Sequence, residues 1–182
     1  MKLPNLLTIL RICLIPLIVL FFYLPVEYNF YYSAALFALA AWTDWLDGYL
    51  ARKWNQTTRF GAFLDPVADK LMVAVALGLL IEAHGSWLMT VPALVIIGRE
   101  IIISALREWM AQVGERTTVA VSSVGKWKTA FQMLGIFVLL AVPAGTVIAY
   151  AGVAVLYVSV ILTIWSMVLY LNAAWPALKA GM

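Results

Sequence analysis

Apolar residues run through the chain in six long stretches, separated by short polar or turn-forming segments. The stretches lie near residues 5–25, 30–52, 61–82, 87–110, 126–146 and 149–174. A membrane-spanning helix needs about 20 mostly apolar residues, so each stretch is long enough to cross a bilayer. The pattern predicts an all-α integral membrane protein with six transmembrane helices, folded as a single domain over residues 1–182.

The composition excludes an ordinary soluble globular domain. Of the 182 residues 65% are hydrophobic and 12% charged, and the mean hydropathy is +0.97. Six spans use almost the whole length, which leaves no room for a separate soluble domain. The first stretch contains Arg11 and is followed by no small-residue cleavage site, so we expect a retained helix rather than a signal peptide.

The twelve Lys and Arg residues indicate how the helices are oriented. The connections near 25–30, 82–87 and 142–149 contain none of them, so all of the basic residues fall on the other side of the predicted membrane. Positively charged loops stay in the cytoplasm, which predicts that both termini are cytoplasmic. The net charge of +3 follows from this bias and from attraction to anionic membrane lipids, so we expect no nucleic-acid partner.

Four aspartates interrupt the second and third apolar stretches. Asp44 and Asp47 are three residues apart, and Asp65 and Asp69 are four apart, so each pair lies on one face of its helix. An ionised carboxylate in a spanning segment is costly unless it is paired, hydrated or bound to metal. Two such pairs on neighbouring helices can meet across the turn at 53–60.

Three kinds of function remain open for these carboxylates. An all-oxygen ligand set suits Mg²⁺ or Mn²⁺, whose remaining charge would attract phosphate oxygens. Salt bridges to Arg52 or Lys70 would give the aspartates a purely structural role. A cation channel or transporter also places acidic residues within its spans, although here they gather toward one side of the membrane. Small residues beside the aspartates favour a cavity that admits a ligand; they are Gly48, Ala51 and Gly61.

The aspartates and their neighbours form an eight-residue motif, Asp44-x2-Asp47-Gly48-x2-Ala51-Arg52-x8-Gly61-x3-Asp65-x3-Asp69. This motif resembles the complete signature of the CDP-alcohol phosphotransferase family. The resemblance implies six transmembrane helices, usually in a homodimer, around a polar cavity that opens to the cytoplasm. It also implies that the cavity binds two divalent cations, Mg²⁺ or Mn²⁺, and the CDP part of the donor.

The same resemblance implies a role for each residue of the motif. Asp44, Asp47 and Asp65 would bind the metal ions. Asp69 would be the catalytic base and a further metal ligand, a choice that the residues alone do not make. The residues implied for CDP binding are Asn5, Thr8, Asp47, Gly48, Ala51, Arg52 and Gly61.

Basic residues outside the motif are candidates for binding the acceptor, the alcohol that receives the transferred group. Arg99 and Arg107 lie in the fourth stretch, and Lys126 and Lys128 begin the fifth. Several cations reaching one cavity suit an acceptor that itself carries a phosphate. Two alternatives stay open, because Arg99 could pair with the adjacent Glu100 and the lysines could anchor a helix end.

Further runs resemble one branch of the family, the bacterial phosphatidylglycerophosphate synthases. These runs are Pro4–Thr8 with Arg11, Thr43–Gly48, Phe63–Lys70 and Gly98–Glu100. The branch implies transfer of a phosphatidyl group from CDP-diacylglycerol to sn-glycerol 3-phosphate, in the bacterial cytoplasmic (inner) membrane and with the active site facing the cytoplasm. Phosphatidylglycerol, an inositol phosphate or serine remains an alternative acceptor.

Overall fold

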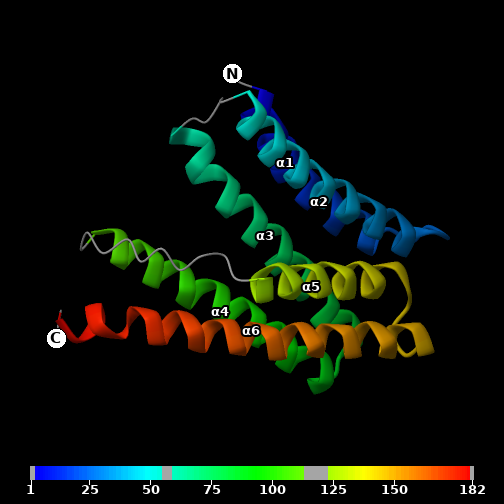
Figure 1. The fold of residues 1–182 in the computed structure, drawn as a ribbon. Helices are drawn as coiled ribbons and strands as arrows, with labels where there is room; N and C mark the ends of the chain where they lie inside the picture. Colours follow the sequence, from blue (N-terminus) through cyan, green and yellow to red (C-terminus); the bar gives the residue numbers. More distant parts are fainter. Residues whose placement is uncertain (1–2, 55–58, 113–122, 181–182) are drawn as a thin grey trace. The chain divides into compact units, whose positions relative to one another are not determined.

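Six α-helices make up the computed structural model, which describes residues 3–54, 59–112 and 123–180. The helices are α1 (Leu3–Tyr23), α2 (Asn29–Lys53), α3 (Arg59–His84), α4 (Trp87–Gln112), α5 (Ser123–Ala141) and α6 (Val147–Ala180) (Figure 1). Within those ranges there is no strand. The prediction of an all-α chain with six helices is confirmed.

The predicted boundaries fail at two helix ends. α5 ends at Ala141, so the apolar stretch near 126–146 extends beyond the helix, whereas the connection expected near 142–149 is present. That segment contains Pro143 and turns at Gly145, whose φ of 83° favours glycine. α6 continues to Ala180 instead of stopping near 174, and Pro176 lies inside it. Hydropathy marks the apolar part of a helix, whereas the hydrogen-bonded helix can extend beyond it into the polar region.

Membrane crossing is supported most directly for three helices. By length and composition, Asn5–Tyr23, Trp87–Gln112 and Val147–Pro176 are long and apolar enough to span a bilayer. α2 and α3 carry the four aspartates as well as other charges, and the apolar part of α5 is the shorter segment Trp127–Ala141. The chain is therefore a membrane protein, while crossing by α2, α3 and α5 stays a prediction.

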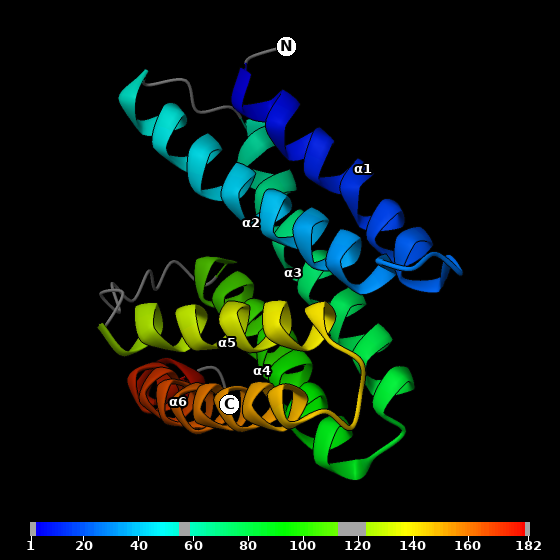
Figure 2. The ribbon, with the colours of Figure 1, turned by 90° about the vertical axis from the view of Figure 1, so that its right-hand side faces the viewer.

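The chain divides into two compact units, and its description as a single domain stays a prediction. The first unit comprises residues 1–85 and 136–150. In it α1 packs along both α2 and α3 (Figures 1 and 2). The buried face of α1 includes Leu14, Ile18 and Phe22, spaced by a helical turn. Asn29 begins α2 by accepting a hydrogen bond from the backbone N–H of Phe30 at 2.9 Å.

The second unit comprises residues 86–135 and 151–182, which include α4 and most of α6. Gly135 on α5 lies against the backbone of α6. A Cβ atom at Gly135 would lie 3.2 Å from the backbone nitrogen of Leu156 and 3.4 Å from the carbonyl oxygen of Gly152. The absence of a side chain lets the two helix backbones approach closely, which is a common device in membrane proteins.

Replacing Gly135 by Val should lower the thermal stability of the purified protein, because the added carbons meet backbone atoms that cannot rotate away. Overpacking of this kind costs about 1–3 kcal/mol. Gly78→Val is the matched control, since Gly78 is also helical but has nothing within 4 Å of its would-be Cβ. Equal melting temperatures for the two variants in detergent would show that α5 and α6 do not need this close approach.

Candidate active site

The four aspartates of the motif lie in the first unit, where α1 contributes a cation to them. Asp44 and Asp47 come from α2, and Asp65 and Asp69 from α3. Arg11 of α1 is fully buried, at 0% exposure. A buried guanidinium requires negative partners, and the neighbouring helices supply them.

Arg11 pairs with three of the carboxylates. Its Nη1 lies 2.8 Å from Oδ1 of Asp44 and also pairs with Asp69, while its Nη2 pairs with Asp47. The fourth carboxylate, Asp65, accepts a hydrogen bond of 2.6 Å from the hydroxyl of Thr8, which lies one turn before Arg11 on α1. The structure thus brings both aspartate pairs together against α1. The meeting of the two pairs was expected, whereas the contacts with α1 were not.

The carboxylates differ in exposure, which gives the cluster an inner and an open side. The Asp47 side chain is 5% exposed, whereas those of Asp44 and Asp69 are 45% and 46% exposed. Asp47 is therefore enclosed by the helices. Asp44 and Asp69 can be reached by a ligand that approaches from the open side.

The donor set of this cluster fits a hard divalent cation, because it offers only carboxylate oxygens, the preferred ligands of Mg²⁺ and Mn²⁺. Among the described residues no three carboxylates, histidines or cysteines stand at mutual distances that would hold a metal ion. Arg11 provides the positive charge at the cluster instead. The assignment of Asp44, Asp47, Asp65 and Asp69 as metal ligands, with Asp69 also the base, stays a prediction.

The residues expected to bind CDP are only partly described. Asn5 and Thr8 are buried on α1, so two of them lie on the helix that carries Arg11. Gly48 directly follows Asp47, and Gly61 lies one turn before Asp65. The side chains of Ala51 and Arg52 lie outside the described residues. A CDP site built from these positions stays a prediction.

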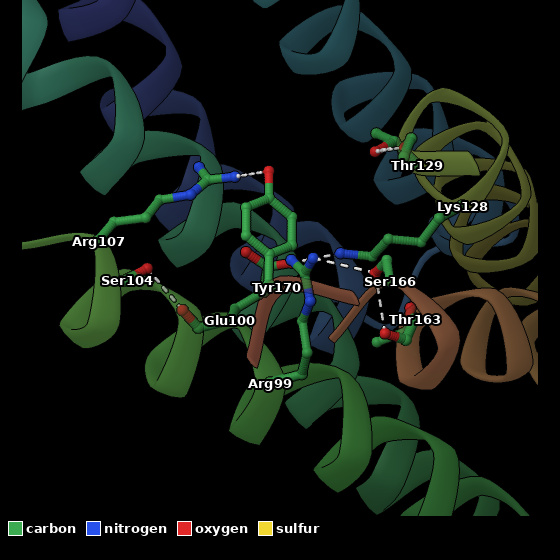
Figure 3. A network of polar contacts seen from close by, with 10 residues as sticks. Arg99, Glu100, Ser104, Arg107, Lys128, Thr129, Thr163, Ser166 and Tyr170 are labelled. Carbon is green, nitrogen blue, oxygen red and sulfur yellow. Dashed lines mark hydrogen bonds and ion pairs between the residues drawn. The ribbon is translucent and has the colours of Figure 1, made fainter. Parts of the chain in front are cut away.

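A second polar cluster lies in the second unit and contains three of the four predicted acceptor-binding residues (Figure 3). Arg99 donates to Oε1 of Glu100 at 2.9 Å, and Lys128 of α5 reaches the same oxygen at 2.5 Å. Both cations are buried. The pairing of Arg99 with Glu100 is therefore present, while binding of an acceptor here stays a prediction; the Lys126 side chain lies outside the described residues.

Arg107 lies two turns after Arg99 on α4 and is exposed. Its Nη2 donates a hydrogen bond of 2.7 Å to the hydroxyl of Tyr170 on α6 (Figure 3). In the described part of the chain it forms no ion pair with a carboxylate. A guanidinium held by a neutral partner keeps its charge available for an anionic ligand.

Arg11 and Tyr170 hold the cations or carboxylates of these clusters and were not among the predicted site residues. Arg11 gave a signal, because a cation inside an apolar span requires a partner, but a single sequence does not identify that partner. Tyr170 gave none, since it is one of eight tyrosines in an apolar background. Its importance depends on the packing of α6 against α4.

The family model for CDP-alcohol phosphatidyltransferase matches residues 1–165. The chain belongs to this family of membrane transferases. It is similar to the CDP-diacylglycerol–glycerol-3-phosphate 3-phosphatidyltransferase of Pectobacterium atrosepticum, with 58% identity over 95% of this chain and 94% of the relative. The Escherichia coli K12 and Shigella flexneri serotype 5b proteins of the same name are 56% and 55% identical over the same shares.

Proposed function

We propose that the chain transfers the phosphatidyl group of CDP-diacylglycerol to sn-glycerol 3-phosphate, giving phosphatidylglycerophosphate and CMP. The observation that carries this proposal is the convergence of the four motif aspartates on α1 in the first unit, three of them at the Arg11 guanidinium and Asp65 at the Thr8 hydroxyl. The names of relatives that are 55–58% identical over 95% of the chain support the same donor and acceptor.

The proposed reaction exchanges one phosphorus–oxygen bond for another. A hydroxyl oxygen of glycerol 3-phosphate bonds to the phosphorus that carries diacylglycerol, and the bond from that phosphorus to the oxygen of CMP breaks. The hydroxyl proton passes to a carboxylate of the enzyme, and CMP leaves with the bonding electrons. Asp69 would be this base, as the family resemblance implies, and the half exposure of its carboxylate supports access by the acceptor hydroxyl.

The other aspartates would hold the metal ions that neutralise the negative charge of the diphosphate. Two divalent cations, Mg²⁺ or Mn²⁺, would neutralise the diphosphate oxygens when bound. Asp44, Asp47 and Asp65 would hold them, together with Asp69, and Asp47, which is enclosed, would form the inner edge of the site. Asn5, Thr8, Gly48, Ala51, Arg52 and Gly61 would line the path of CDP.

The phosphate of the acceptor would bind to the cations of the second unit. Arg99, Arg107 and Lys128 supply guanidinium and ammonium groups suited to a phosphate monoester, and Lys126 would contribute from the start of α5. Glu100 holds two of these cations through one carboxylate oxygen. An incoming phosphate would therefore share Arg99 and Lys128 with Glu100, and would meet Arg107 without such competition.

The proposed setting is the bacterial cytoplasmic (inner) membrane, with both termini and the active site on the cytoplasmic side. Water-soluble glycerol 3-phosphate and CMP would exchange with the cytoplasm, while the lipid donor and product stay in the membrane. A homodimer is part of the proposal. Exposed apolar side chains on α6, such as Ile161, Trp165 and Val168, offer a surface for lipid or a second copy.

An acceptor panel tests the proposed function directly. Purified protein, CDP-diacylglycerol and Mg²⁺ are incubated with glycerol 3-phosphate, phosphatidylglycerol, an inositol phosphate or serine, and CMP and the lipid product are measured by mass spectrometry. We expect product with glycerol 3-phosphate. Preference for another acceptor would overturn the acceptor assignment, and absence of CMP release with every acceptor would leave a transport or scaffold role.

Arg99→Ala and Arg107→Ala should each raise the KM for glycerol 3-phosphate much more than the KM for CDP-diacylglycerol. Loss of a charge-assisted contact is worth about 1.5–3 kcal/mol, or roughly a tenfold to hundredfold loss of kcat/KM. Lys128→Ala should act in the same direction. Lys179→Ala is the control, because Lys179 is exposed near the end of α6 and lies over the Trp175 ring. Unchanged acceptor kinetics in all three variants would exclude this cluster as the phosphate site.

A further inference from the structure

α6 has two chemically different faces in the second unit. Ser159, Thr163, Ser166 and Tyr170 recur every three or four residues, so they form one polar stripe along the helix. The opposite face carries exposed apolar side chains, among them Ile161, Ile164 and Trp165. Ser159, Thr163 and Ser166 are buried, so these polar groups of the stripe face the interior of the unit rather than lipid.

Two members of this stripe contact the two arginines of α4. Arg99 donates from Nη2 to the hydroxyl oxygen of Ser166 at 3.1 Å, and Ser166 donates its own proton to the carbonyl of Thr163 at 2.9 Å. Arg107 donates to the Tyr170 hydroxyl at 2.7 Å. Figure 3 shows both contacts, which pair two turns of α4 with one turn of α6.

The aromatic ring of Tyr170 also lies close to the guanidinium groups of both Arg99 and Arg107. The guanidinium carbon of Arg107 lies 5.0 Å from the ring centroid, and that of Arg99 lies 6.0 Å from it. These distances are within the range of cation–π attraction. One aromatic side chain therefore restrains two guanidinium groups that would otherwise repel each other and sample many rotamers.

The network keeps hydrogen-bonding capacity for a ligand. Within the described ranges, the Nε of Arg99 and the hydroxyl of Thr163 are buried without a hydrogen-bond partner. Buried polar groups are nearly always satisfied in a purely structural network. An unsatisfied buried guanidinium nitrogen beside an exposed guanidinium is expected where an anion completes the arrangement.

We propose that Tyr170, assisted by Ser166, is a positioning residue that aligns Arg99 and Arg107 to receive the phosphate of the acceptor. This inference rests on the proposed function and adds to it a residue on a different helix. Tyr170 does not touch the reacting phosphorus in this scheme. It acts through the two arginines, so it should affect acceptor binding and not the chemical step.

Tyr170→Phe removes the hydroxyl and keeps the ring. Because the hydroxyl acts on the phosphate only through the orientation of the guanidinium groups, its loss should cost less than the loss of a direct charge-assisted contact and should raise the KM for glycerol 3-phosphate roughly 3- to 10-fold. The kcat at saturating acceptor and the KM for CDP-diacylglycerol should stay within about twofold of wild type, because only acceptor binding depends on these arginines. Tyr170→Leu should give a larger rise in the same constant, since it also removes the ring face.

Inorganic phosphate gives a second measurement. It should compete with glycerol 3-phosphate, and Tyr170→Phe should weaken this inhibition by about the factor that it adds to the acceptor KM. Tyr157→Phe is the matched control, because Tyr157 lies on the same helix more than three turns earlier. Ser166→Ala provides an independent variant and should raise the same KM through Arg99.

A double variant separates positioning from general damage. Tyr170→Phe should have little further effect once Arg107 is replaced by Ala, because the hydroxyl then has no guanidinium to hold. Additive effects, or equal loss of kcat and of donor affinity, would overturn the positioning role. If Arg107→Ala raises the acceptor KM and neither Tyr170→Phe nor Ser166→Ala does, this inference fails and the proposed function stands. If the wild type does not use glycerol 3-phosphate, both fail.

Discussion

Replacing Asp69 by Asn should abolish phosphatidyl transfer and leave binding of CDP-diacylglycerol largely intact. The amide keeps the size of the side chain but cannot accept the hydroxyl proton, and loss of a general base typically lowers the rate by roughly 10²–10⁴-fold. Asp69 lies half exposed on the open side of the cluster, and its replacement leaves the enclosed carboxylate of Asp47 in place to hold a metal ion. CMP release measures the chemistry, and a thermal shift with donor and Mg²⁺ measures binding.

The comparison variant is Asp47→Asn, which should lose both activity and donor binding. Asp47 is 5% exposed and would hold a metal ion at the inner edge of the site. Asp44→Asn and Asp65→Asn should resemble it, with activity below about a tenth of wild type, equivalent to about 1.4 kcal/mol of barrier. If Asp69→Asn loses donor affinity as completely as Asp47→Asn does, Asp69 is chiefly a ligand and another group is the base.

Replacing Arg11 by Met should destabilise the protein strongly in the presence of a chelator. Arg11 is fully buried and pairs with three carboxylates, one of them enclosed. Removing one partner of a buried charge network typically costs about 3–5 kcal/mol, because the remaining charges are left without compensation. Thermal or denaturant unfolding in detergent measures the loss. Lys53→Met is the control, since Lys53 is an exposed cation at the end of α2.

Two further measurements connect this loss to the carboxylates. Adding Asp47→Asn to Arg11→Met should recover part of the stability, because the enclosed carboxylate is then neutral. Millimolar Mg²⁺ should raise the melting temperature of Arg11→Met more than that of wild type, since a bound cation would replace the missing charge. If Arg11→Met is as stable as Lys53→Met with chelator present, Arg11 is not the counter-charge of the cluster.

The sequence was sufficient for the six helices and for the pairing of the four aspartates on two helix faces. Six apolar stretches gave six helices, and the spacing of Asp44, Asp47, Asp65 and Asp69 placed each pair on one helix face. Both predictions rest on local periodicity, which a single sequence contains. The motif also predicted the family, and the match of the family model over residues 1–165 confirms it.

The features that the sequence did not predict depend on contacts between helices that are far apart in the chain. The pairing of Arg11 with the aspartates needs α1 to pack along α2 and α3 in one register, and hydropathy does not encode that register. The contact between Arg107 and Tyr170 joins residues 63 positions apart. Both errors in helix ends, at Ala141 and Ala180, arose where the apolar character of a segment and its helical hydrogen bonding end at different residues.

The length of α6 has a consequence for lipid dependence. Its 34 residues extend for about 51 Å at ~1.5 Å per residue, whereas the hydrocarbon layer is about 30 Å thick. Measured from Val147, Ser166 lies about 29 Å and Tyr170 about 35 Å along the axis. With Val147 at one edge of the hydrocarbon layer and α6 along the membrane normal, Ser166 and Tyr170 would lie at the opposite edge of that layer. A thicker bilayer would draw this end of the helix into hydrocarbon. We therefore expect the proposed binding of the acceptor to depend on bilayer thickness.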